Sequence, residues 1–213
     1  KKIVFVNFSG SAMAIVPETQ NCDAILQAWY PGQAGGQAVA EVLFGDYNPA
    51  GKLPLTFYRN LAQIPDFEDY NMTGRTYRYM KETPLFPFGH GLSYTTFKYG
   101  KLKMNDDKIA AGQNLNLVIP VTNTGSRDGD EVVQVYLKKM DDTEGPVKTL
   151  RAFKRVRIPA GKTVEVKFSL DDTQLEWWDE QSNTMRVCPG NYTVMIGGTS
   201  CEKSLLSRAF TIR

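Results

Sequence analysis

Two loops in the first thirty residues carry side chains suited to binding a sugar. Asn7 and Ser9 occupy a small polar loop after the first apolar run, and Trp29 and Tyr30 end the second apolar run. Loops at the carboxyl ends of strands contact ligands in open α/β sheets, and aromatic faces can stack on sugar rings. We therefore take these four residues as candidates for the rim of a substrate pocket. Core packing is the competing interpretation of the two aromatics and the favoured one, because such rings bury large areas wherever they occur.

The first part of the chain also contains carboxylates that could be mistaken for a catalytic pair. They are Glu18, Glu41, Asp46, Asp66, Glu68 and Asp69. Retaining cleavage of a glycosidic bond uses a nucleophilic carboxylate and an acid/base carboxyl group about 5 to 5.5 Å apart. Surface acids are far commoner than catalytic ones, and Glu18 is the strongest of the six candidates because it comes next after the loop that ends the first strand. We therefore assign a catalytic role to none of them.

The residue types argue against a metal or organic cofactor. Three cysteines form no CxxC pair and only one histidine, His90, is present, so a Cys/His zinc site lacks ligands at usable spacing. The glycines at 32, 35 and 36 match neither the P-loop nor the GxGxxG pattern. Cys188 and Cys201 flank a predicted strand, and whether they form a disulfide stays open. We predict no metal and no cofactor.

Charge and hydropathy narrow the possible partners. Lys and Arg number 25 against 23 for Asp and Glu, which is too little excess charge to attract polyanions broadly. No apolar run approaches the roughly 20 residues that cross a bilayer. Cations and aromatics alternate from Arg75 to Tyr79, and we assign this stretch to packing and contacts between domains. We expect neither a nucleic-acid nor a membrane partner.

The residues before Phe97 indicate part of an α/β domain. Ile3–Val6 and 24–29 are predicted strands, the first one buried on both faces. A helix is predicted after the glycines at 35 and 36. Val39, Val42 and Leu43 would form its inward face, and Gly45 would end it. Residues 53–57 are predicted to form an edge strand, because Pro54 cannot donate to a ladder. Two or three strands are too few for a doubly wound sheet. Either an upstream segment of the same polypeptide or another chain must supply the missing strands, and we expect the first.

Beyond residue 97 the chain shows strict alternation of apolar and polar residues. The alternating apolar positions are Leu115 to Val121, Val133 to Leu137, Val164 to Leu170, Tyr192 to Ile196, and Phe210 with Ile212. Turn residues separate these runs, in the rhythm of a small β-sandwich. We predict a fold of two parts: a partial flavodoxin-like α/β sandwich with linker at 1–97, and an immunoglobulin-like or fibronectin type III-like sandwich at 98–213. Of Trp177 and Trp178, one is expected to be buried and one partly exposed.

Several segments together resemble glycoside hydrolase family three, the β-xylosidase and β-glucosidase group. They are AWYPGQAGG at 28–36, VLFGDYNPAGKLP at 42–54, PFGHGLSYTTF at 87–97, LRAFKRV at 150–156 and PGNYTV at 189–194. The resemblance covers essentially the whole chain. It implies a modular parent with an N-terminal (β/α)8 barrel, then an α/β sandwich, then a fibronectin type III-like domain.

The resemblance also implies what this chain contributes to the parent. The family hydrolyses terminal β-linked sugars with retention, and both of its catalytic carboxyls would lie upstream of Lys1. We therefore expect the chain alone to be inactive and its parent, secreted to the periplasm or the cell exterior, to act on β-xylosides, with β-glucosides as the other option. The upstream barrel and sandwich segment and the parent's oligosaccharide substrate would be its partners. The alternative function is a non-catalytic module that binds carbohydrate or stabilises neighbouring domains.

Overall fold

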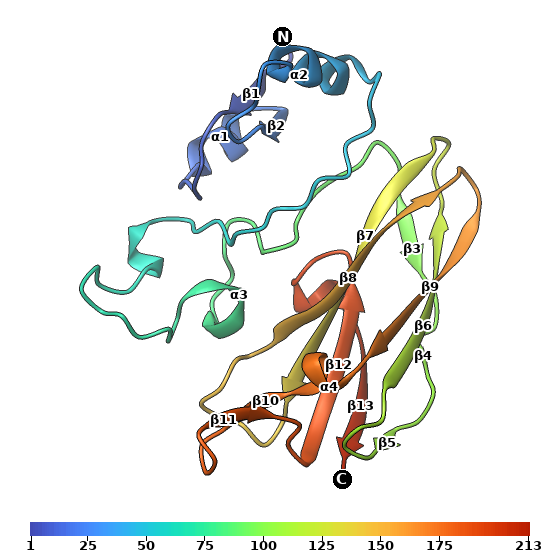
Figure 1. The fold of residues 1–213 in the computed structure, drawn as a ribbon. Coiled ribbons are helices and arrows are strands. Elements are labelled where there is room, and N and C mark those ends of the chain that lie inside the picture. Colours follow the sequence, from blue (N-terminus) through green and yellow to red (C-terminus); the bar gives the residue numbers. More distant parts are fainter.

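Alternating apolar residues build a β-sandwich that fills the second half of the molecule. The computed structural model describes all 213 residues, and Figure 1 shows a small α/β unit at the N-terminal end and the sandwich at the C-terminal end. Long segments with little helix and no strand connect the two parts. The fold is therefore α/β followed by all-β, as the sequence predicts.

The N-terminal part contains two strands and short helices. Its elements are β1 (Val4–Asn7), α1 (Val16–Asn21), β2 (Ala24–Gln27), α2 (Gly35–Phe44), the 3-10 helix η1 (Leu61–Gln63) and α3 (Thr76–Tyr79). Strands β1 and β2 are parallel and in register, so that Asn7 pairs with Gln27 at their carboxyl ends. The predicted stop of α2 is confirmed, because Gly45 caps the helix with a φ of 83°. None of the helices is long and apolar enough to span a bilayer.

The sandwich consists of two packed sheets. Its elements are β3 (Phe97–Tyr99), β4 (Lys103–Met104), β5 (Lys108–Ile109), β6 (Leu115–Asn123), β7 (Gly129–Lys139), β8 (Thr149–Ile158), β9 (Thr163–Leu170), α4 (Asp172–Leu175), β10 (Trp177–Asp179), β11 (Thr184–Arg186), β12 (Gly190–Gly197), the 3-10 helix η2 (Glu202–Ser204) and β13 (Leu206–Ile212). One sheet has the order β5-β13-β12-β7-β8, and in the other β6 pairs with β3, β4 and β9. Strands β10 and β11 form a separate ribbon.

The hydrophobic core lies in the sandwich. A cluster of 21 buried residues is drawn entirely from positions 102 to 212 and includes the alternating residues of β6, β7, β9, β12 and β13. At about 25 cal/mol per Å² of apolar surface, burial of this cluster is the main force that stabilises the chain. The α/β unit has no comparable cluster.

Two predicted strands differ from the structure. Ile3 and Val4 are 53% and 42% exposed, so the prediction of a strand buried on both faces was wrong for this chain, because β1 has β2 as its only neighbour. Residues 53–57 form no strand; Phe57 makes a single bridge to Phe86. Pro54 lacks an amide hydrogen, which prevents a continuous ladder there.

Two smaller expectations are also settled by the structure. On the predicted inward face of α2, Val39 and Val42 are half-buried, whereas Leu43 is 43% exposed because no element covers that side of the helix. Cys188 and Cys201 are both free, as is Cys22. The disulfide left open by the sequence is therefore not formed.

Candidate functional site

Asn7 and Ser9 lie at the carboxyl ends of the parallel strands, within one polar cluster. The Asn7 amide donates to Gln27 Oε1 at 2.6 Å and to Ser9 Oγ at 3.0 Å. Gln27 Nε2 in turn donates to the Ser9 carbonyl at 3.1 Å. Asn7 and Ser9 are 5% and 8% exposed, so these contacts fix the loop after β1 from inside. Sequence reasoning missed Gln27, although its place at the end of the second strand was a usable signal.

Trp29 and Tyr30 differ sharply in exposure. Trp29 is half-buried, has a φ of 56° and packs edge-on against Phe57 with ring centroids 6.4 Å apart. Tyr30 is 79% exposed, and its ring lies so close to Gly10 that a Cβ there would meet Tyr30 Cε2 at 2.5 Å. The two predicted rim loops thus touch through Tyr30 and Gly10. Of the four candidate residues, only Tyr30 presents its ring to the surroundings.

Three of the six acids of the first part accept local hydrogen bonds. Glu41 accepts from Gln37 one turn earlier on α2, at 2.7 Å. Asp66 and Asp69 accept backbone amides two residues ahead, at 3.0 and 2.9 Å. The backbone and side-chain hydrogen bonds from Asn71 lower the pKa of Asp69, which is the opposite of what a general acid requires.

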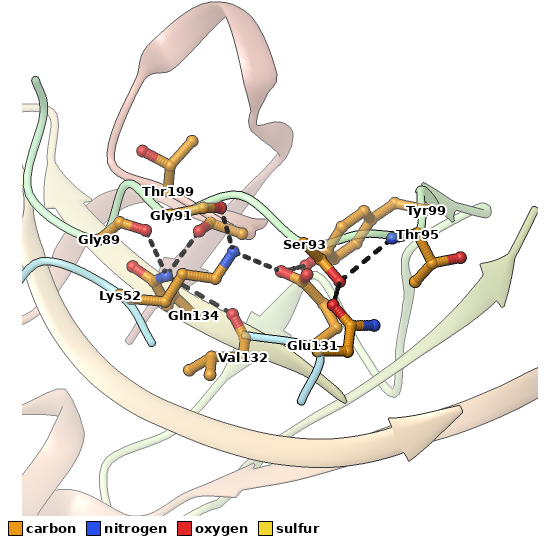
Figure 2. A network of polar contacts seen from close by, with 12 residues as sticks. Lys52, Gly89, Gly91, Ser93, Thr95, Tyr99, Glu131, Val132, Gln134 and Thr199 are labelled. Carbon is orange, nitrogen blue, oxygen red and sulfur yellow. Dashed lines mark hydrogen bonds and ion pairs between the residues drawn. The ribbon is translucent and has the colours of Figure 1, made fainter. Parts of the chain in front are cut away.

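A buried ion pair joins the linker to the sandwich. Lys52 Nζ lies 3.3 Å from Glu131 Oε1, and the two side chains are 15% and 6% exposed. Tyr99 donates to the same carboxylate oxygen at 3.1 Å, and Lys52 also donates to the Gly91 carbonyl at 3.0 Å. Figure 2 shows these side chains converging between the linker and β7.

Burial decides the electrostatics of this ion pair. It raises the pKa of Glu131, while the charge of Lys52 and the hydrogen bond from Tyr99 oppose the rise. Burial and the nearby Glu131 raise the pKa of Tyr99 so far that the phenol stays neutral. Because Glu131 is enclosed and already has two partners, it serves as a structural carboxylate rather than a reacting one.

Gln134 fastens the segment around His90. Its amide donates to the carbonyls of Gly89 and Gly198, at 3.3 and 2.7 Å, as Figure 2 shows in part. Gly89 has a φ of 77°, and a Cβ there would collide with the Gln134 side chain. The His90 ring stacks on Phe86 at 5.2 Å, and burial together with the charge of Lys52 lowers its pKa. The His90 ring therefore has a structural role, through stacking on Phe86.

The remaining sequence expectations concern aromatic residues. Tyr77 stacks on Phe88 at 4.3 Å, and its hydroxyl accepts the Leu150 amide at 3.1 Å, which confirms packing and contacts between parts for this stretch. Trp177 is 3% exposed and Trp178 49% exposed, as predicted. No group of three or more His, Cys, Asp or Glu side chains is placed to hold a metal ion.

Known protein families match both parts of the chain. Residues 1–94 match the glycosyl hydrolase family 3 C-terminal domain, and residues 131–200 match a fibronectin type III-like domain. A protein named xylan 1,4-beta-xylosidase from Xylanibacter ruminicola is 53% identical over 212 residues, which cover 100% of this chain and 24% of that protein. A periplasmic beta-glucosidase from Salmonella typhimurium is 39% identical, over 95% of this chain and 28% of its own length.

Solved structures agree with these relatives. A β-glucosidase from Erythrobacter marinus superposes with a TM-score of 0.85 and 38% identity, over 99% of this chain and 28% of that one. A β-glucosidase from Listeria innocua in complex with isofagomine gives a TM-score of 0.84 and 27% identity, over 100% and 31%. The chain thus spans about a quarter to a third of the proteins that it matches. It belongs to glycosyl hydrolase family 3, of which it holds the C-terminal domain followed by a fibronectin type III-like domain.

Proposed function

We propose that the chain is the C-terminal part of a longer retaining β-glycosidase that removes terminal, non-reducing β-D-xylosyl residues from oligosaccharides. The 53% identity to a xylan 1,4-beta-xylosidase, over the full length of this chain, carries this proposal. Identity to the Salmonella β-glucosidase is 39%, so β-D-glucosyl residues are the second choice. Retaining hydrolysis needs two carboxyl groups and no cofactor.

The chain supports this chemistry without supplying the reacting groups. Residues 1–97 would complete the α/β sandwich of the parent, and residues 98–213 would form its fibronectin type III-like domain. Glu41, Asp66 and Asp69 are engaged in local hydrogen bonds. Glu131 is held by Lys52 and Tyr99. An upstream barrel and sandwich segment would provide both catalytic carboxyls.

Within this scheme, Asn7, Ser9, Trp29 and Tyr30 contribute to the pocket rim. The exposed ring of Tyr30 would contact the sugar, Trp29 would support it from the side of Phe57, and the buried Asn7 and Ser9 would hold the neighbouring loop. Loops in this position, at the carboxyl ends of parallel strands, are where α/β folds bind ligands.

The parent would work in the periplasm or outside the cell. This rests on the relative from Salmonella typhimurium, which is named a periplasmic β-glucosidase.

Activity assays on two proteins test the proposal. The longer polypeptide that includes this chain should hydrolyse an aryl β-xyloside faster than an aryl β-glucoside, and the purified 213-residue chain should hydrolyse neither. Turnover by the chain alone, retained after repurification, would contradict the assignment of both carboxyls to the upstream segment. An inactive longer protein that still binds neutral xylo-oligosaccharides would favour the non-catalytic carbohydrate-binding module, for which Trp178, 49% exposed, is the first residue to substitute.

A further inference from the structure

Two arginines, one in α3 and one at the edge of the sandwich, lie near each other and form no ion pair with an acid. Arg78 belongs to α3 and Arg151 to β8. Val147, just before β8, donates from its amide to the Arg78 carbonyl at 2.6 Å, and the Leu150 amide donates to the Tyr77 hydroxyl at 3.1 Å. Neither guanidinium takes part in any of the six ion pairs of the structure. Burial, and then the charge of Arg78, lowers the pKa of Arg151, while the nearby charge of Glu176 opposes this fall. Glu176 forms no ion pair with Arg151, so a carboxylate in direct contact with the guanidinium would add to this partial compensation.

Buried polar atoms without a partner occur around the start of β8. The Nε atoms of Arg78 and Arg151 and the hydroxyl of Thr149 are buried and have no hydrogen-bond partner. Arg151 donates from one terminal nitrogen to the Glu176 carbonyl at 2.7 Å, whereas its charge is left without a carboxylate in contact. Buried polar groups are nearly always paired in native proteins, so three unpaired ones around the start of one strand need an explanation.

The backbone places Arg151 in a special position. Val135 of β7 pairs with Ala152 and Tyr136 pairs with Leu150, so Arg151 is the extra residue of a β-bulge. Bulges redirect a side chain away from the regular pleat and occur often beside functional sites. The guanidinium lies 5.1 Å above the centre of the Trp177 ring, which supports it from one side by a cation–π contact.

A shallow hollow opens beside this arginine. It is lined by Leu150, Arg151, Ala152, Phe153 and Gln174. Phe153 is 64% exposed although it sits on a strand of the sandwich. The hollow therefore combines a cation, a side-chain amide and an open aromatic ring.

We propose that Arg78, Thr149 and Arg151 bind the carboxylate of an acidic saccharide, such as a hexuronic acid unit, whose ring lies against Phe153. A guanidinium fork matches the two oxygens of a carboxylate, and hydrogen bonds between such charged groups are about twice as strong as neutral ones. A free phosphate would satisfy the charge but would leave the aromatic ring and the amide unused. The inference rests on the proposed carbohydrate function and adds a second contact site, on the sandwich and away from the rim loops.

Calorimetric titration of the chain with three probes tests the inference. The probes are a glucuronate-bearing xylo-oligosaccharide, the neutral xylo-oligosaccharide of the same length, and inorganic phosphate. The acidic sugar should bind at least tenfold more tightly than either other probe. R78M and R151M should each weaken its binding about 10- to 100-fold, the range expected for loss of a charged hydrogen bond. Trp177, beneath Arg151, should report the binding by fluorescence.

R208M is the matched control, because Arg208 is exposed on β13 of the same sheet and forms no ion pair. It should leave binding unchanged. R151K keeps the charge but loses the forked guanidinium, so its affinity for the acidic sugar should lie between those of R151M and the unsubstituted chain. If R151M fails to fold, R78M still tests the inference. Equal affinity for acidic and neutral sugars, equal affinity for phosphate, or no effect of either arginine would overturn the inference. Each of these results would leave the glycosidase assays of the longer protein unaffected, so the two proposals fail separately.

Discussion

The buried pair of Lys52 and Glu131 is a residue-scale test of how the two parts are held together. In K52M, Glu131 would lose its cation while it remains only 6% exposed. Removal of one partner of a buried ion pair costs about 3 to 5 kcal/mol, so we expect the free energy of unfolding to fall by about 3 kcal/mol. Urea denaturation measures this change.

R157M is the control for K52M. Arg157 pairs with Asp128 at 3.3 Å, but the two side chains are 74% and 49% exposed. Exposed pairs contribute about 0 to 1 kcal/mol. A loss in K52M no larger than that in R157M would show that the linker ion pair contributes little.

His90 gives a pH prediction with a defined sign. Its pKa in the folded chain lies below the ordinary value of 6.5, so the unfolded chain binds more protons in the window between the two values. Stability should therefore rise with pH across that window, by at most about 1.4 kcal/mol per pH unit, and be lost as the pH falls from 6.5. H90F retains an aromatic ring to stack on Phe86 but cannot titrate. The rise of stability with pH in this window should therefore disappear in H90F. Urea denaturation from pH 4.5 to 7.5 measures both curves, and parallel curves would contradict the prediction.

At the scale of elements, the sandwich and linker cap the C-terminal end of α2. Arg127 donates to the Gly45 carbonyl at 2.6 Å, and the Tyr94 hydroxyl donates to the Val42 carbonyl at 2.6 Å. The last carbonyls of a helix have no partner within it and favour cations nearby. In R127M we expect faster amide exchange in α2 and a loss of about 1 kcal/mol in stability.

Hydrogen exchange with peptide resolution shows whether R127M destabilises only the C-terminal end of α2 or the whole chain. Exchange should rise in the peptide that covers residues 35–45 and stay unchanged in β12 at the centre of the five-stranded sheet. A uniform rise in both segments would mean that Arg127 stabilises the sandwich rather than the helix end.

For the whole molecule, the location of the core predicts which part folds alone. All 21 residues of the core cluster lie between 102 and 212. A polypeptide of residues 97–213 should therefore show a cooperative thermal transition, whereas residues 1–57 should not, because they lack enough buried apolar surface. Circular dichroism with near-ultraviolet spectra measures both. A cooperative transition in residues 1–57 would show that the α/β unit is stable without the contacts described above.

Periodicity in the sequence was sufficient to predict the sandwich. Alternating apolar residues in β6, β7, β9 and β12 face one core, because side chains on a strand point to opposite faces in turn. Periodicity did not predict β8, because its residues 150–156 were recognised only as the family motif LRAFKRV. Its burial pattern does not alternate, since an edge strand with a bulge has fewer neighbours to impose it.

The sequence by itself determined the family, the order of an α/β part and a β-sandwich, and the rim candidates at the ends of two strands. Tertiary structure alone decided that Asn7 and Ser9 are buried while Tyr30 is exposed, that Lys52 pairs with Glu131, and that Arg78 lies near Arg151. The physical reason is the sequence separation of the residues that interact. Periodicity and turn chemistry act over a few neighbouring residues. Asn7 instead bonds to Gln27 on the next strand, and the Lys52–Glu131 and Arg78–Arg151 pairs join positions about 70 to 80 residues apart, which only tertiary packing brings together.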